Sequence, residues 1–415
     1  MPSPTPPRAT ISPLAPLKPD LYERAWFSAV HPTLPLLATA HGTSVTVFSL
    51  TTLTAHSTLT RGHERSVRCA AWKPVQKGMC LVTGSFDSTA GLWRWEDDEG
   101  EPGAVDVAGT GPDHEWQFTL VLEGHDSEIK SVAFSPGGEF LATSSRDKTV
   151  WIWEDVGADD DEWETVAVLN EHEGDVKAVA FCPDVPGRNS RRRYSADVLA
   201  SASYDDTVRI WREDGEGEWV CVAVLTGHEG TVWGIAWEGV EREDGAFPRL
   251  STFSADGTIR VWKLKEEDED DNGAPAGGSF GAIPTSIRKS LREEWICEAV
   301  LPKVHTRDIY SVAWSAKSGL LASTGSDGTI VVYQEDAGTP PLEEGDAAAE
   351  VKGQPGPGKW NVLAKYDSGH GPYEINHIIW CPRYDSAPDR KAGEEMLVTT
   401  GDDGLVRTWA VSVGQ

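Results

Sequence analysis

Methionine and cysteine are scarce in this sequence, and long apolar runs are absent. The chain has 415 residues but only 3 Met and 6 Cys, and no two cysteines form a C-x-x-C pair. Cysteines this scattered in a chain this large argue against a disulfide framework or a zinc site. We therefore expect no metal site and a reducing compartment, the cytosol and also the nucleus. The cysteines are Cys69, Cys80, Cys182, Cys221, Cys297 and Cys381.

Signals for membrane insertion and secretion are also missing. No window approaches the 18 consecutive apolar residues that a membrane-spanning helix needs. The first twenty residues contain seven prolines, whereas a secretory signal has a charged start followed by an apolar run. We expect neither membrane association nor export by that route.

Positive charge is in short supply. The chain has 37 Lys and Arg against 66 Asp and Glu, a net charge of −29, and such a body is repelled by nucleic-acid phosphates. Nucleic acid is therefore excluded as an expected partner. However, 22 of the acids lie in the runs 96–101, 154–164, 266–271 and 343–350, which contain no Lys or Arg. The charge is mostly a property of these solvated loops, and it says little about a binding face.

Tryptophan and glycine, by contrast, are abundant, with 18 Trp and 41 Gly. So much Trp suggests one aromatic per recurring unit. A unit does recur: it begins with Gly-His or His, continues with alternating apolar residues to an aromatic, and closes with a phrase like Ser-x-Asp-x-Thr-Val-x-x-Trp. Clear copies are GHDSEIKSVAF (124–134) with SSRDKTVWIW (144–153), and GHEGTVWGIAW (227–237) with SADGTIRVW (254–262).

Two spacings hold through the copies. Histidines stand nine residues before an aromatic at His63, His125, His172, His228 and His305. Aspartates stand six residues before Trp or Tyr in the pairs Asp87 and Trp93, Asp147 and Trp153, Asp205 and Trp211, Asp256 and Trp262, Asp327 and Tyr333, and Asp403 and Trp409. His370 belongs to the last copy, but one extra residue precedes Trp380. A seventh, degenerate copy opens the chain from Trp26 to Phe48, with Gly42 at the Asp position.

The copies predict an all-β fold of seven blades in a single domain. Phrases such as SVAFSP and TVWIWE alternate with period two and are broken by Pro-Gly or Asp-Gly turns, which is typical of short antiparallel strands, four to a blade. The expected blades span about 20–50, 58–97, 115–155, 163–213, 219–264, 295–335 and 359–411. Acidic loop insertions are expected at 96–112, 265–294 and 336–359, with another insertion at 184–197. The segment 10–20 should pair with the last blade and close the ring.

The His, Ser or Thr, and Asp of each copy resemble the groups of a nucleophilic triad. A catalytic constellation is needed only once, whereas this set recurs around the whole ring. A structural role is much better supported. The Asp accepts a hydrogen bond from the His, the His is hydrogen-bonded to a strand hydroxyl, and the network ends at the indole N–H of the Trp. We assign no catalytic residue and no cofactor, and we read the cysteines as blade packing. A basic cluster at Arg188 and 191–193 is read as a solvated loop rather than a nuclear signal.

These motifs resemble the WD-repeat β-propellers over nearly the whole chain. In that family one face presents the residue before the turn Asp and residues near the start of the inner strand. The resemblance implies partner-binding roles at both positions. Before the turn Asp, or at the matching place, the residues are Phe86, Arg146, Tyr204, Ala255, Ser326 and Asp402. Near the start of the inner strand they are Trp26, Arg68, Lys130, Lys177, Trp233, Tyr310 and Asn376. This set is mainly aromatic and basic, as interaction hot spots are.

Several longer phrases are closer still to one branch. These phrases resemble the WD-repeat family of cytosolic iron–sulfur protein assembly. They are AWFSAV, LEGHDSEIKSVAFSP with LATSSRDKTVWIWE, EWVCVAVLTGHEGTVWGIAW and HTRDIYSVAW. The resemblance implies a non-enzymatic docking platform, monomeric on its own. Its expected partners are a HEAT-repeat adaptor, a small α/β adaptor, a hydrogenase-like iron–sulfur carrier and client apoproteins. A generic WD-repeat adaptor in chromatin or ubiquitin-ligase complexes remains the alternative, and an enzyme using the central channel comes third.

Overall fold

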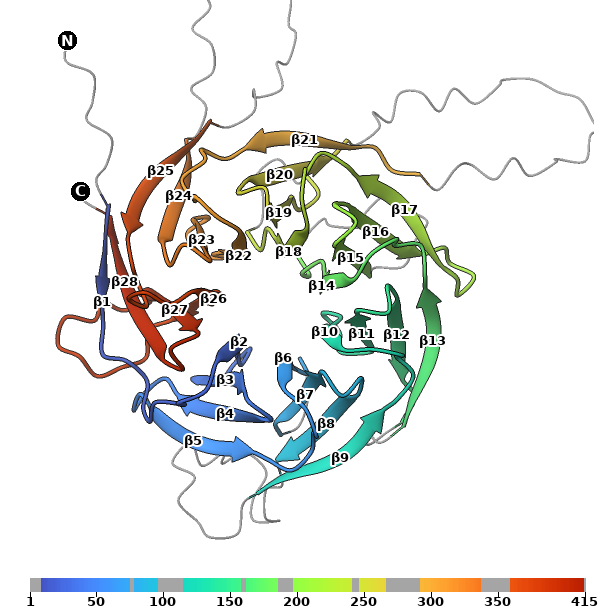
Figure 1. The fold of residues 1–415 in the computed structure, drawn as a ribbon, viewed down its shortest axis with the longest axis horizontal. Helices are drawn as coiled ribbons and strands as arrows, with labels where there is room; N and C mark the ends of the chain where they lie inside the picture. The colour runs from blue at the N-terminus through green and yellow to red at the C-terminus, as the bar shows by residue number, and fades with distance from the viewer. Residues whose placement is uncertain are drawn as a thin grey trace, which may run out of the picture.

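The computed structural model describes residues 9–74, 78–95, 115–157, 162–185, 197–240, 246–265, 292–336 and 359–413. In these ranges the chain forms β-strands β1 to β28 and no helix, so none is present that could cross a membrane. Seven four-stranded antiparallel sheets are arranged in a ring (Figure 1). The predicted all-β, seven-bladed propeller is confirmed.

In each blade the first strand lies nearest the axis of the ring (Figure 1). Blade 1 consists of β2 (Ala25–Val30), β3 (Leu36–His41), β4 (Ser44–Ser49) and β5 (Thr54–Leu59). Blade 2 consists of β6 (Val67–Trp72), β7 (Cys80–Ser85), β8 (Ala90–Trp95) and β9 (Trp116–Leu122). Blade 3 consists of β10 (Ile129–Phe134), β11 (Phe140–Ser145), β12 (Val150–Asp155) and β13 (Trp163–Leu169). Blade 4 consists of β14 (Val176–Phe181), β15 (Val198–Ser203), β16 (Val208–Glu213) and β17 (Trp219–Leu225). Blade 5 consists of β18 (Val232–Trp237), β19 (Leu250–Ser254), β20 (Ile259–Leu264) and β21 (Trp295–Val300). Blade 6 consists of β22 (Ile309–Trp314), β23 (Leu321–Gly325), β24 (Ile330–Asp336) and β25 (Lys359–Tyr366). Blade 7 consists of β26 (Ile375–Pro382), β27 (Glu395–Gly401), β28 (Val406–Val413) and β1 (Ala9–Pro13).

The sheets are offset by one strand from the blade bounds expected from the repeats. Residues 116–122 open the expected blade 115–155, yet they form β9, which pairs with β8 of blade 2 in the register Trp93↔Phe118. In blades 2 to 6 the outer strand thus comes from the sequence repeat that follows. The repeat marks the period of the chain, whereas the hydrogen bonds run across the repeat boundary and tie neighbouring units together.

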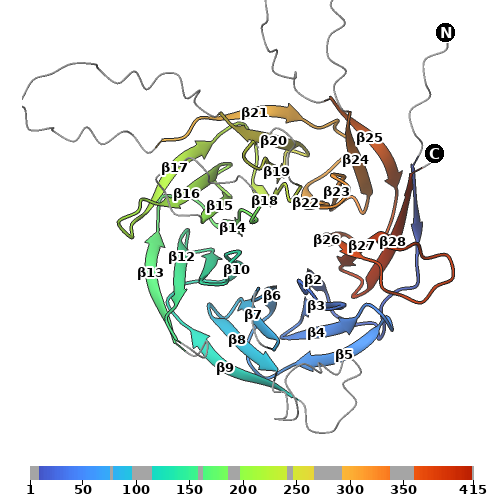
Figure 2. The same cartoon turned by 180° about the vertical axis from the view of Figure 1, so that it is seen from behind.

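The N-terminal segment closes the ring. Strand β1 pairs antiparallel with β28, from Ala9↔Val413 to Pro13↔Trp409 (Figure 2). Two backbone bonds continue the contact, from the N–H of Leu14 to Thr408 (2.8 Å) and from that of Leu17 to Val406 (3.1 Å). Lys18 then forms a bridge to Thr54 of β5. The predicted closure is confirmed, and it covers the edge of β28 that would otherwise remain unpaired.

The hydrophobic core is divided among the interfaces between blades. The second strand of most blades is buried along its whole length, as in β7, because a neighbouring blade covers each face. Three inner-strand tryptophans donate their indole N–H to a carbonyl of the preceding blade: Trp72 to Ala29 (3.0 Å), Trp237 to Ala180 (3.0 Å) and Trp380 to Ala313 (3.2 Å). Part of the high Trp content is therefore explained by contacts between blades.

Buried ion pairs also join neighbouring blades. Arg249 donates to Glu238 of its own blade at 2.7 Å and to Glu335 of blade 6 at 2.7 Å, with only 5% of the Arg249 side chain exposed. Arg212 of blade 4 pairs with Glu293, just before β21, at 2.8 Å, and both side chains are almost fully buried. Removal of one partner from such a pair leaves an uncompensated buried charge, which is costly.

The structure narrows two of the expected insertions. The 265–294 insertion includes Glu293, whose buried pairing with Arg212 makes it part of the fold. The 336–359 insertion begins and ends on paired residues, because Asp336 and Lys359 lie opposite one another in β24 and β25. The following lie outside the described residues: 96–112, 266–291 and 337–358, the arginines at 188 and 191–193, and most of the acidic runs.

Candidate protein-interaction face

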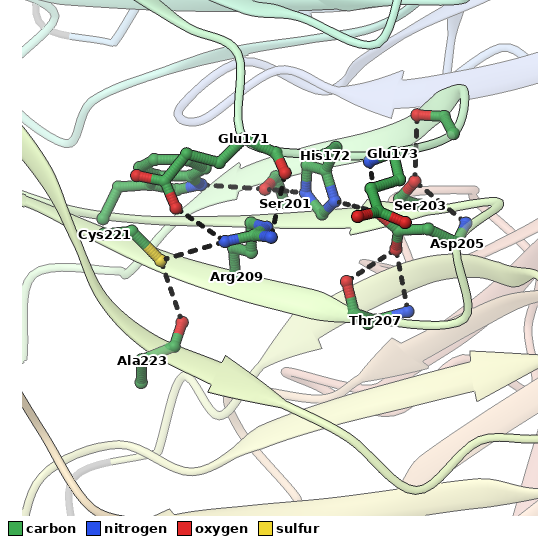
Figure 3. Close-up of polar contacts among 12 residues, drawn as sticks. Glu171, His172, Glu173, Ser201, Ser203, Asp205, Thr207, Arg209, Cys221 and Ala223 are labelled. Carbon is green, nitrogen blue, oxygen red and sulfur yellow. Dashed lines mark hydrogen bonds and ion pairs between the residues drawn. The ribbon is translucent and has the colours of Figure 1, made fainter.

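Six blades contain the hydrogen-bonded set that the repeat predicts. In blade 4 (Figure 3) Nδ1 of His172 lies 2.8 Å from Asp205, and its Nε2 lies 2.7 Å from the hydroxyl of Ser201. That hydroxyl accepts from the indole of Trp211 at 2.8 Å. The same path joins His63, Asp87, Thr83 and Trp93; His125, Asp147, Thr143 and Trp153; His228, Asp256, Thr252 and Trp262; and His370, Asp403, Thr399 and Trp409.

Two blades vary the set. In blade 6, His305 contacts Asp327 and Ser323, and Tyr333 takes the Trp position, where burial raises its pKa to about 12. Blade 1 joins β3 to β4 through Gly42 and Thr43 alone, so it has no turn Asp. The extra residue before Trp380 does not disturb the contacts of His370.

The turn carboxylates are strongly stabilised in their charged form. Burial alone would raise the pKa of Asp147, but the bonds donated by His125 and Thr149 outweigh it and hold that pKa at about 2. Hydrogen bonds to the charged form have this effect. Since the hydroxyl of Ser201 is fully buried and already accepts from Trp211, no substrate could reach it. These sets therefore act in blade structure, as their repetition suggested.

A β-bulge lies at the start of the inner strand in every blade. In each inner strand the register shifts at the second residue, which is left without a partner on the neighbouring strand. Bulges re-aim side chains and often lie beside functional sites. The seven bulged residues are the ones that the resemblance assigned to this position: Trp26, Arg68, Lys130, Lys177, Trp233, Tyr310 and Asn376.

The residue before each turn Asp is held next to the bulge. In blade 3 the backbone N–H of Arg146 donates to the carbonyl of Glu128, two residues before Lys130. Five other blades have an equivalent bond, in which the N–H of the residue before the turn Asp donates to the carbonyl of the residue two before the bulge. The donor and acceptor residues are Phe86 and Ser66, Tyr204 and Asp175, Ala255 and Thr231, Ser326 and Asp308, and Asp402 and Glu374. The two expected positions of each blade are thus brought together, and we name these side chains the bulge face.

Blades 3 and 4 form a hollow of about 290 Å³ on the bulge face. It is lined by Glu128, Lys130, Arg146, Asp175, Lys177 and Tyr204. Arg146 lies between the two blades, 3.7 Å from Glu128 and 4.0 Å from Asp175, with 59% of its side chain exposed. Tyr204 is 62% exposed, and the ammonium of Lys177 lies 5.5 Å from its ring. The hollow therefore presents an exposed guanidinium beside an exposed aromatic ring.

Cations and aromatic rings alternate around the rest of blades 1 and 2. The guanidinium carbons of Arg24 and Arg68 each lie 4.8 Å from the centre of the Trp26 ring. Trp26 contacts Phe86 (6.2 Å between ring centres), and the ammonium of Lys130 lies 4.3 Å from the Phe86 ring. Each of these cations is therefore attracted to an aromatic ring of the protein itself.

Blades 5 to 7 supply aromatic and acidic groups instead. Trp233 and Tyr310 meet edge to face at 5.3 Å, and the Trp233 indole donates to Asp308. Asn376 donates to Asp402, which also pairs with Arg24 at 2.6 Å. Ala255 and Ser326 add only small side chains. The cations of the bulge face therefore lie in blades 2 to 4, and its one carboxylate, Asp402, lies in blade 7.

Sequence reasoning missed the carboxylates of this face. Glu128 lies 2.7 Å from Lys130, and Asp175 lies 3.1 Å from Lys177, so both lysines are paired. The predicted set remains a prediction, but the acids two residues before the bulge, which the prediction did not include, offset the charge of its two lysines. Their signal was present as the phrases Glu-Ile-Lys and Asp-Val-Lys in matching positions. Arg24 and Arg65 were missed as well.

No group of three or more metal-ligating side chains comes together in the part of the chain that the structure describes. Four of the six cysteines are buried, and burial raises the pKa of Cys69 to about 12. A thiol held so firmly protonated is a poor metal ligand.

The comparisons with known proteins agree with this architecture. A family model described as "WD domain, G-beta repeat" matches residues 49–94, 116–154, 163–212, 219–263 and 295–334, which is more than half of the chain. A protein of Pyricularia oryzae is 61% identical over 96% of both chains. Proteins of Neurospora crassa and Chaetomium globosum are 55% identical, over 99% and 100% of this chain and 98% and 100% of their own. All three carry the name "Probable cytosolic iron-sulfur protein assembly protein 1". The chain therefore belongs to the WD-repeat proteins and, among them, to the family of cytosolic iron–sulfur protein assembly protein 1.

Proposed function

We propose that this protein is a non-catalytic scaffold of cytosolic iron–sulfur protein assembly, which docks assembly factors and apoprotein clients so that clusters can be inserted. The observation that carries the proposal is the near full-length similarity to relatives named for that process. The fold supports it, since a closed propeller of seven blades offers a rigid, many-sided platform. We place it in the cytosol and also in the nucleus, where further clients would be met.

We propose three direct partners besides the clients: a HEAT-repeat adaptor, a small α/β adaptor and a hydrogenase-like iron–sulfur carrier. The cluster travels as cargo on the carrier. The raised pKa of the buried Cys69 thiol supports this division of labour, because cluster ligation requires thiolates. The chain acts as a monomer whose surface brings the other components together.

We propose that partner binding uses the bulge face, with Arg146 as the main contact. Its guanidinium is exposed, and its two carboxylate neighbours lie at 3.7 and 4.0 Å, beyond ordinary hydrogen-bond distance. It is therefore available to pair bidentately with a carboxylate of a partner, as either a side chain or a chain terminus. Tyr204 beside it offers a ring on which a flat group can stack.

Affinity purification of the tagged full-length protein tests the proposal. We expect iron–sulfur assembly factors to copurify, and we expect depletion of the protein to lower the activity of a cytosolic iron–sulfur enzyme without lowering that enzyme's abundance. Histones or ubiquitin-ligase subunits in place of assembly factors would instead support the generic adaptor. Normal enzyme activity after complete depletion would refute the assembly function.

A further inference from the structure

One cation of the bulge face differs from the others in its surroundings. Lys130 and Lys177 each have a carboxylate two residues earlier in the chain and pair with it. At the same position before Arg68 the chain has Ser66. Among the described residues no carboxylate lies within ion-pair distance of Arg68, so the charge of its guanidinium is left without a counter-charge.

The immediate neighbours of Arg68 increase this imbalance. Its Nη1 donates to the carbonyl of Trp26 at 3.3 Å, and within the described ranges no other hydrogen bond from it is found. The side chain is half-buried, and Arg24 lies over the same Trp26 ring. Burial, together with the positive charge of Arg24, lowers the pKa of Arg68. A half-buried guanidinium with unused donors attracts an anion.

A second donor lies on the neighbouring inner strand. His377 of β26 packs against Phe27 of β2, with the two rings tilted and their centres 4.0 Å apart, and its Nδ1 accepts a hydrogen bond from the N–H of Ser28 at 3.3 Å. Burial and the charge of nearby Arg68 lower the pKa of His377 to about 3, so the imidazole is neutral. Since Nδ1 accepts, the proton resides on Nε2. In the described structure nothing accepts a hydrogen bond from that Nε2–H.

We propose that Arg68 and His377 form an oxyanion site between the inner strands of blades 7, 1 and 2, which binds a single phosphate or carboxylate group. The guanidinium supplies charge and a planar pair of donors, and the neutral imidazole supplies one further N–H. The bound anion provides the counter-charge that Arg68 lacks among the described residues. The site is separate from the hollow around Arg146, whose lining does not include Arg68 or His377, so loss of anion binding in an Arg68 variant can be distinguished from loss of partner binding in an Arg146 variant.

Titration calorimetry with inorganic phosphate and, separately, with acetate tests the site at constant ionic strength. We expect the wild-type protein to bind one equivalent of one of these anions at millimolar concentration, and Arg68→Gln to weaken that binding at least tenfold. Lys265→Gln, which removes an exposed cation far along the chain at the end of β20, serves as the matched control and should bind as the wild type does. Preference for phosphate would assign the site to the free ion, and preference for acetate to a carboxylate carried by another polypeptide.

Equal binding by wild type and Arg68→Gln, or no binding of either anion, would overturn the proposal. A second readout needs no variant of Arg68. In ¹⁵N-histidine spectra of the wild-type protein the anion should shift one Nε2 resonance, and that resonance should be missing in His377→Asn. Spectra that do not change on addition of the anion would refute the site even if Arg68→Gln fails to fold.

Discussion

The turn carboxylate collects the hydrogen bonds of its blade at one point. Asp147 accepts from Nδ1 of His125, from the backbone N–H of Asp126, and from both the N–H and the hydroxyl of Thr149. We expect Asp147→Ala to lower the free energy of unfolding by about 1–3 kcal/mol, because these donors lose their acceptor. Denaturant titration measures the loss, with Lys148→Ala on the same turn as the control. The folded fraction should still bind partners; full stability with lost binding would contradict a structural role.

The same carboxylate predicts a pH dependence. The folded-state pKa of Asp147 is about 2, below its ordinary value of 3.8. Its charge therefore contributes stability that is fully present above about pH 4 and is lost as the pH falls toward 2. We expect the stability gap between wild type and Asp147→Asn to be larger at pH 5 than at pH 3. A gap that stays constant over this range would show that the ionised form is not what stabilises the turn.

The residue contacts show which details a sequence can reveal. The His, hydroxyl, Asp and Trp sets were predictable because their spacing is constant, and constant spacing on a repeated fold places them in the same contacts. The pairing of Lys130 with Glu128 was missed although the phrases Glu-Ile-Lys and Asp-Val-Lys recur, because Glu128 lies just before β10 begins, outside the alternation by which strand residues are assigned to a face. The bulge changes the direction of Lys130, and a bulge has no sequence signature of its own.

Strand β1 belongs to the last blade although it begins the chain, and one of the residues that follow it is deeply buried. Leu17 is 1% exposed and contacts the interface between blades 7 and 1. We expect Leu17→Ala to cost about 2–5 kcal/mol, as for other buried leucines. Thr10→Ala on the exposed side of β1 should change stability by less than about 0.5 kcal/mol. Thermal and denaturant unfolding of both variants would check this, and equal effects would mean that closure adds little.

The hairpin of β24 and β25 sets the ends of one insertion. Because Asp336 and Lys359 lie opposite one another, a short turn can join them directly. We expect deletion of residues 337–358 with such a turn to leave the melting temperature nearly unchanged. The deletion at the other acidic insertion must spare Glu293, since its loss would leave Arg212 unpaired in the interior. A large loss of stability on deletion of 337–358 would mean that this segment packs on the ring.

The sequence predicted how many strands there are, and that they are β-strands, better than it predicted which strands pair with one another. Period-two phrases identify strands whatever sheet they join, so four strands per repeat were predictable. The choice of sheet for β9 depends on how the ring closes, which is a property of all seven blades together. For that reason the blade bounds were shifted by one strand, while the pairing of β1 with β28 was predicted from the need to cover an edge.

The distribution of charge over the whole molecule leads to a prediction about binding. The protein carries a net charge of −29, yet blades 1 to 4 present Arg24, Arg65, Arg68, Lys130, Arg146 and Lys177 on one face. We expect Arg146→Glu to weaken partner or client binding by about 2 kcal/mol or more, the scale of a hot spot. Its melting temperature should remain within error of the wild type, because the side chain is exposed.

Lys265→Glu is the matched control for Arg146→Glu. Its side chain is 58% exposed, against 59% for Arg146, and the charge changes by the same amount. Affinities for purified assembly factors, measured by calorimetry, should fall for Arg146→Glu alone. An equal fall in both variants would point to the overall charge of the protein, and no fall in either would place the binding site elsewhere.

The seven bulges also bear on how such a ring can change over time. Because each bulged residue stands outside the ladder of its sheet, its side chain can be replaced with little consequence for the register of the strands on either side. Trp, Arg, Lys, Tyr and Asn all occupy this one position in a single molecule. The scaffold thus separates the residues that maintain the ring from those that we propose contact its partners, and selection can revise the second set while the first stays as it is.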